Sequence, residues 1–161
     1  MDRHPASREE RRPGAEGVMR TMTVGADSLV RGIATSGRHG RSFSLGIADA
    51  VTVLAKTAAQ ADAAATIIAN AVDLPGHPAI RRMPANELQP DSDLGDRPVT
   101  RDVGVLTEPE IETALEAGTG RARQLLATGL IEGAALRLLG ETVVVGARGI
   151  ETPHAVHKPA V

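Results

Sequence analysis

The segment Ala34–Val72 reads ATSGRHGRSFSLGIADAVTVLAKTAAQADAAATIIANAV, and the other elements must arrange themselves around it. Val51–Ala55 is a short apolar run rich in β-branched residues, which predicts a buried strand. Thr57 can cap a helix, and the alanine-rich segment from Ala58 to about Ala71 is a good helix former. The sequence therefore predicts a strand that leads almost directly into a helix.

Two oxygen-bearing side chains in that helix are the first candidates for chemistry. Residues four apart on a helix share a face, so Asp62 and Thr66 are expected to lie side by side. Mg²⁺ or Ca²⁺ takes oxygen ligands, and this pair supplies two, with backbone carbonyls or substrate phosphates completing the shell. The alternative is structural, because a helical Thr often bonds the carbonyl four residues back and an early Asp often faces the helix dipole or water.

A turn of small residues precedes this unit. Thr35, Ser36 and Gly37 end a predicted strand, and exposed backbone N–H groups at such a turn can receive phosphate oxygens. A tight turn without a ligand is the other interpretation of the same residues. The sequence contains neither a Walker G-x-x-x-x-G-K pattern nor a G-x-G-x-x-G pattern after a strand.

Composition excludes several classes of function. The 161 residues include one aromatic side chain, Phe43, and no cysteine. We expect an aliphatic core that depends on close backbone approach, and no disulfide, thiolate metal site or thiol nucleophile. The net charge of −2 disfavours nucleic-acid binding, and no apolar run has the length of a membrane span. The N-terminus lacks an apolar secretory segment, which predicts a cytoplasmic protein.

The rest of the chain predicts further strands and one more helix. Alternation at Val18–Val24 and the run Leu29–Thr35 favour two strands that pair with each other. Asp73–Pro98 has no periodicity and is expected to be a long connection. Arg101–Leu106 is typical of a short strand. The helix after it is expected to begin with a capping box at Thr107–Glu110 and to end near Thr128, with Gly129 as the stop.

The chain is expected to end in a hairpin and a tail. Ala134–Leu138 and Thr142–Val145 alternate as strands around a Gly140–Glu141 turn. The element order β-β-β-α, long connection, β-α-β-β predicts an α+β fold with a mainly antiparallel sheet packed against two helices. The expected organisation is a disordered tail at 1–17, a domain at 18–147 and a flexible tail at 148–161.

Three segments together resemble the ApbE family of magnesium-dependent flavin transferases. Members of that family carry A-T-S-G, then an S-V-T-V strand, then A-D-x-x-A-T at the start of a helix. The matching segments here are Ala34–Gly37, Ala50–Val53 and Ala61–Thr66, in the same order and with similar spacing. The residues around the second segment and the Pro-rich connection are more similar still to an uncharacterised ApbE-like branch.

The resemblance implies a partial ApbE-like domain, related to the T-fold, with a defined site. The Asp and Thr of A-D-x-x-A-T help to hold Mg²⁺, which assigns Asp62 and Thr66 as metal ligands. The metal neutralises the pyrophosphate of FAD, and Thr35, Ser36 and Gly37 lie near that cofactor. The family's enzymes move FMN onto a Thr or Ser hydroxyl of a target protein and release AMP, and positioning and charge neutralisation carry most of this transfer.

The sequence departs from the family pattern in two places. The family's H-I-I-D-P-x-T-G loop is replaced here by Arg41–Asp49, which has no histidine. The family's N-terminal half, with its N-x-G-G-D segment, has no counterpart, so we expect a truncated product or fragment that self-associates or is marginally stable. We expect a flavin-nucleotide-binding protein without competent FMN transfer. The alternative is a non-catalytic structural or binding domain that lost the cofactor.

Overall fold

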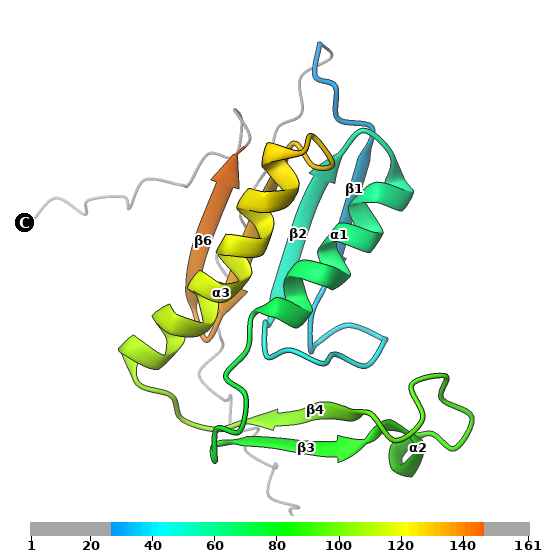
Figure 1. The fold of residues 1–161 in the computed structure, drawn as a ribbon, viewed down its shortest axis with the longest axis vertical. Helices are drawn as coiled ribbons and strands as arrows, with labels where there is room; N and C mark the ends of the chain where they lie inside the picture. Colours follow the sequence, from blue (N-terminus) through cyan, green and yellow to red (C-terminus); the bar gives the residue numbers. More distant parts are fainter. Residues whose placement is uncertain (1–26, 147–161) are drawn as a thin grey trace, which may run out of the picture.

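The computed structural model of the protein describes residues 27–146. These residues form an α+β fold, as the sequence predicts, with an antiparallel four-stranded sheet of order β1-β2-β5-β6 and a two-stranded ribbon that pairs β3 with β4 (Figure 1). In chain order the elements are β1 (Gly32–Ser36), β2 (Ala50–Ala55), α1 (Ala58–Ala71), β3 (Ile80–Pro84), α2 (Ala85–Leu88), β4 (Pro98–Val103), α3 (Glu108–Ala127), β5 (Gly133–Leu138) and β6 (Glu141–Gly146).

The central strand and helix are both present: β2 begins one residue earlier than predicted, at Ala50, and α1 has the predicted boundaries. β2 pairs with β1 on one side and with β5 on the other, so it lies inside the large sheet. α1 begins after Thr57, whose hydroxyl accepts a hydrogen bond from the backbone N–H of Gln60 at 3.1 Å. The predicted cap is therefore confirmed, and α1 packs over β1 and β2 (Figure 1).

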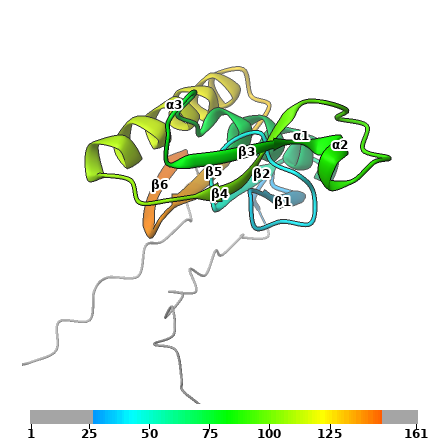
Figure 2. The same ribbon diagram turned by 90° about the horizontal axis from the view of Figure 1, so that it is seen from below.

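The two long helices share one face of the sheet. α3 lies beside α1 and covers β5 and β6, and Figure 2 shows both helices on the same side of the strands. They meet at Gly118, where an added Cβ would lie 2.3 Å from Cγ2 of Val72 and 2.8 Å from Cδ2 of Leu136. The core is aliphatic and depends on close backbone approach at this glycine, which confirms the expectation from composition.

The two faces of the large sheet differ in character. Val51 and Val53 on β2 are fully buried against the helices. The residues that alternate with them point the other way, because neighbouring strand residues face opposite sides. That second face carries Thr35 and Thr52, whose hydroxyl oxygens are 2.8 Å apart, and Ile33, whose exposed fraction is 56%. Within residues 27–146 no helix covers this face (Figure 2).

The connection Asp73–Pro98 is more regular than its sequence indicates. It contains β3 and α2, and β3 pairs with β4. The strand predicted at Arg101–Leu106 is therefore shifted, because β4 already begins at Pro98. Pro98 and Pro84 lie opposite each other at the end of this ladder. Proline fits a two-stranded ribbon because both strands are edges, and its presence hides the strand pattern in the sequence.

Arg82 attaches this ribbon to the rest of the fold. Its guanidinium donates hydrogen bonds to the Asp73 carboxylate, to the Leu45 carbonyl and, at 3.3 Å, to the Thr100 hydroxyl. The backbone N–H of Thr100 also donates to the Ser44 carbonyl at 2.9 Å. A two-stranded ribbon is marginally stable by itself, so these contacts fix it against the end of α1 and the loop before β2.

The terminal hairpin forms as predicted, with its turn one residue earlier. The turn residues are Leu139 and Gly140, with φ angles of 47° and 95°, and not Gly140–Glu141. Two positive φ angles in a two-residue loop are typical of a type I′ turn, which matches the twist of the flanking strands. β1 corresponds to the predicted Leu29–Thr35 strand. Its predicted partner, Val18–Val24, and the tails at 1–17 and 148–161 lie outside the described residues.

Candidate functional site

The structure places Asp62 and Thr66 on the exposed side of α1. The residues of α1 that face the sheet are Ala61, Ala65 and Ile68, all fully buried, and the pair lies outside that stripe. Within residues 27–146 neither side chain forms a hydrogen bond or an ion pair. Thr66 in particular does not donate a hydrogen bond to the carbonyl four residues back. Thr113 of α3 does make such a bond, to the Pro109 carbonyl at 2.7 Å. Both oxygen groups are thus available to a ligand.

The turn after β1 uses several of its own polar groups. The backbone N–H of Arg38 donates to the Ala48 carbonyl at 2.9 Å, and that of Gly40 donates to the Gly37 carbonyl at 3.0 Å. Gly37 has a φ of 146°, and a Cβ there would lie 2.5 Å from the carbonyl oxygen of Asp49. The turn is therefore packed tightly, and two of its N–H groups already have acceptors.

The side chains of Thr35 and Ser36 point to opposite faces of the sheet. Thr35 lies opposite Thr52 on the face away from the helices, whereas Ser36 lies opposite the buried Val51 on the helix face. The Thr35 hydroxyl and the Asp62–Thr66 pair are therefore on different sides of the sheet. Ser36 is the turn residue whose side chain shares a side with the pair.

Ser36 and Thr66 also lie at a similar height along the sheet. Gly32 at the start of β1 packs against the start of α1, since its added Cβ would lie 2.2 Å from the Thr57 carbonyl carbon. The two elements run in the same direction from that point, because α1 and β1 both run antiparallel to β2 (Figure 1). Four strand residues advance about 13 Å, which brings Ser36 level with Thr66 and about 6 Å beyond Asp62.

A protein-only metal centre is not formed in the described part of the chain. No group of three or more His, Asp or Glu side chains among residues 27–146 is arranged to hold a metal ion. Mg²⁺ commonly keeps several waters and takes one or two protein oxygens together with substrate phosphates. The Asp62 carboxylate and Thr66 hydroxyl fit that second arrangement, in which a nucleotide brings part of the coordination shell.

Sequence reasoning missed a charged cluster beside the turn. The Asp49 carboxylate accepts a hydrogen bond from Nε of Arg38 at 2.8 Å and forms an ion pair with its Nη2 at 2.6 Å. It also lies 3.2 Å from Nε2 of His39. Its second oxygen accepts the backbone N–H of Leu139 at 2.6 Å. The Arg38 and Asp49 side chains are only 16% and 15% exposed. This cluster fixes the loop, and no sequence spacing indicates it.

The predicted capping box of α3 is present and includes a histidine contact. The Oε2 atom of Glu110 accepts the backbone N–H of Thr107 at 2.7 Å, and its Oε1 atom lies 2.9 Å from Nε2 of His77. These bonds, the backbone bond from Thr107 above all and then that from His77, lower the pKa of Glu110 from 4.5 to about 2. The contact ties α3 to the segment before β3.

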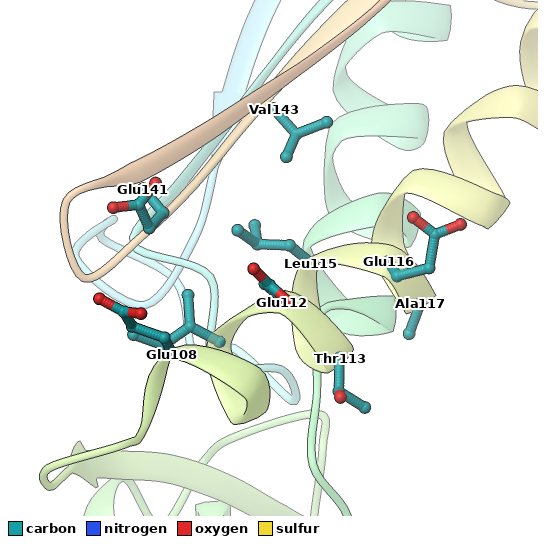
Figure 3. A pocket seen from close by; sticks show the side chains of 9 residues that line it. Glu108, Glu112, Thr113, Leu115, Glu116, Ala117, Glu141 and Val143 are labelled. Atoms are coloured by element: carbon teal, nitrogen blue, oxygen red, sulfur yellow. The ribbon is translucent and has the colours of Figure 1, made fainter.

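A pocket of about 960 Å³ lies between α3 and β6, on the part of the helix layer away from α1 and β1 (Figure 3). We call it the α3–β6 pocket, and sequence reasoning did not foresee it. It is separate from the Asp62–Thr66 pair. Its lining residues are Glu108, Ile111, Glu112, Thr113, Leu115, Glu116, Ala117, Glu141 and Val143.

The fold and the exposed pair define a small two-layer α+β protein with an exposed carboxylate and hydroxyl on one helix. The chain matches the family described as "AbpE bacteria" over residues 9–144, and it therefore belongs to that family. No curated protein and no solved structure matches it. Among residues 27–146, no helix combines the length and the apolar character that crossing a bilayer requires.

Proposed function

We propose that this protein binds a flavin nucleotide, FAD, together with Mg²⁺, and that it does not carry out efficient FMN transfer. The proposal is supported by the order of the three ApbE-like segments and by the family match over residues 9–144. The observation that carries it is the exposure of Asp62 and Thr66 one helical turn apart, with no competing partner in the described residues.

Asp62 has the main role in this proposal. Its carboxylate and the Thr66 hydroxyl would hold the cation on the outer side of α1. When bound, Mg²⁺ neutralises the charge of the FAD pyrophosphate, whose oxygens complete the coordination. Ser36 would meet the nucleotide, because its side chain faces the same side of the sheet as α1.

The expectation of inefficient transfer rests on how the possible bases near the turn are held within residues 27–146. Transfer of FMN needs a group that accepts the proton of the target hydroxyl. Asp49 is the nearest carboxylate by position, but both of its oxygens are occupied by Arg38 and the Leu139 N–H. His39 is 63% exposed and contacts that same carboxylate. Neither group is therefore held as a base towards α1.

The test is the thermal unfolding of the full chain with FAD, with MgCl₂ and with both. A ligand that binds only the folded state raises the midpoint, and an FAD concentration of 100 times Kd adds about 2.7 kcal/mol. We expect the largest rise with both ligands, a loss of the Mg²⁺-dependent part in Asp62→Asn and Thr66→Val, and no loss in Asp96→Asn, an exposed control on another segment. An unchanged midpoint, or equal rises in all variants, contradicts the proposal.

The second candidate is a non-catalytic binding domain that has lost the cofactor. One observation favours this candidate: neither Asp62 nor Thr66 lines the α3–β6 pocket, so the pair that would hold the cation does not open into that pocket. Retention of yellow colour through purification, with a flavin absorption spectrum, separates the two candidates without any variant.

A further inference from the structure

The α3–β6 pocket combines four carboxylates with an apolar floor. Glu108, Glu112 and Glu116 repeat every fourth position on α3, and Glu141 comes from the first position of β6. Figure 3 shows Glu108 and Glu141 at one end of the pocket, with Glu112 between that end and Glu116. A single elongated site therefore presents a row of negative charges.

These charges have little compensation within the described residues. Glu116 forms an ion pair with Arg123 at 2.9 Å, but both side chains are more than 60% exposed, so water screens that contact. Glu108, Glu112 and Glu141 form no ion pair within residues 27–146, and none of the residues that line the pocket is Lys or Arg. Like charges four apart on a helix repel each other, so a cationic partner along this row relieves that repulsion.

The floor of the pocket shows what else the partner must carry. Ile111 and Leu115 of α3 form its largely buried base, with exposed fractions of 8% and 4%, and Val143 of β6 is half-buried. Figure 3 shows Leu115 and Val143 facing the same space. A hydrated metal ion makes no use of such a floor. A partner with alternating cationic and apolar groups can pair with the glutamates at the rim of the pocket and contact the apolar residues of its floor.

We propose that the α3–β6 pocket binds a basic amphipathic helix of a partner protein. Carboxylates four residues apart on α3 repeat about every 6 Å, which is also the spacing of Lys or Arg residues four apart on a partner helix. The cationic side chains pair with the glutamates, and the neighbouring apolar side chains contact Val143 and the small exposed parts of Ile111 and Leu115. This interaction is independent of nucleotide binding at Asp62 and Thr66.

The experiment uses the full chain and a fluorescein-labelled synthetic peptide with Lys and Leu placed on one helical face. Fluorescence anisotropy at low ionic strength measures its Kd, and added NaCl should weaken binding. The double variant Glu112→Gln/Glu141→Gln should raise Kd about tenfold. The double variant Glu87→Gln/Asp96→Asn makes the same change in net charge at exposed positions outside the pocket, and it should change Kd less than about twofold.

A second peptide tests the apolar floor. It has the same composition in an order that places no Lys–Leu face on a helix, and it should bind about tenfold more weakly than the first. Val143→Thr keeps the shape of the side chain but makes the floor polar, and it should weaken the ordered peptide more than the scrambled one. Circular dichroism confirms that each variant is folded.

Several results overturn the proposal. The first is equal weakening in both double variants, which means that the peptide responds only to net charge. A second is equal binding of both peptides, or no binding of the ordered one. Efficient displacement by spermidine combined with no effect of Val143→Thr assigns the pocket to a small polyamine. A dimer in sedimentation that Glu112→Gln/Glu141→Gln abolishes assigns it to a second copy of this chain.

Discussion

The carboxylate of Asp49 accepts the backbone N–H of Leu139 at 2.6 Å, although the two residues are 90 positions apart. The same carboxylate holds Arg38, so it connects the loop between β1 and β2 to the turn between β5 and β6. The backbone adds a further link, because the Asp49 N–H donates to the Arg137 carbonyl at 2.9 Å. One side chain thus ties together the end of the large sheet.

Replacing that carboxylate should destabilise the fold strongly. Asp49→Ala leaves the mostly buried guanidinium of Arg38 without its partner and the Leu139 N–H without an acceptor. We expect the free energy of unfolding to fall by about 2 to 4 kcal/mol. Urea denaturation followed by circular dichroism measures this loss. Asp96→Ala removes an exposed carboxylate and should stay within about 0.5 kcal/mol, and a similar loss in both variants contradicts this role for Asp49.

The hairpin turn offers a stabilising substitution. Leu139 has a φ of 47°, a conformation that costs a branched side chain energy, and Gly140 follows with a φ of 95°. Asn-Gly is the preferred pair for a type I′ turn, and the main-chain N–H that Asp49 binds is unchanged. Leu139→Asn should therefore raise the free energy of unfolding by about 0.5 to 1 kcal/mol.

The matched control for this prediction is Gly140→Ala. It places a Cβ at a positive φ and should lower stability by about 1 kcal/mol or more. The two substitutions act in opposite directions within one turn, so thermal or urea unfolding of both variants separates backbone strain from a general effect of altering the hairpin. A loss of stability in Leu139→Asn would show that the side chain of Leu139 contributes more than its conformation costs.

The sequence predicts the elements that depend on neighbouring residues. The Thr57 cap, the alanine-rich helix and the Thr107–Glu110 capping box are local signals, and all three are present. The exposure of Asp62 and Thr66 follows from helical periodicity in the same way. β3 and α2 escape prediction, because proline interrupts the alternation that indicates a strand.

Features formed by segments that are far apart in the sequence cannot be predicted from local sequence patterns. The spacing of Glu108, Glu112 and Glu116 is visible in the sequence, but a pocket requires Glu141 and Val143 of β6 to face them. That placement depends on the strand order β1-β2-β5-β6, which no local pattern specifies. The α3 wall of the pocket could therefore be found from the sequence, and the β6 wall could not.

Two glycines of α3 should respond in opposite directions to the same substitution. Gly118 packs against Val72 and Leu136, and an added methyl group would overlap both side chains. We expect Gly118→Ala to lower the free energy of unfolding by about 1 to 3 kcal/mol, despite the better helix propensity of Ala. Gly120 has no neighbouring atom within 4 Å of such a Cβ, so Gly120→Ala should stabilise by about 0.5 to 1 kcal/mol. Equal effects in urea denaturation would contradict the close approach of α1 and α3.

Acid should remove the contribution of Glu110. Its hydrogen bonds with Thr107 and His77 lower the pKa from 4.5 to about 2, so the folded state binds this proton less readily than the unfolded state. The resulting stabilisation is complete above pH 4.5 and is lost as the pH falls towards 2.

Glu110→Gln keeps the shape of the side chain but cannot ionise. Wild type should therefore be more stable than this variant at about pH 6, and the difference should shrink steadily between pH 4.5 and about pH 2. Urea denaturation at several pH values measures both curves, with Glu87→Gln, an exposed carboxylate outside α3, as the control that should follow wild type. A constant difference between wild type and Glu110→Gln across that range means that the ionised carboxylate does not cap the helix.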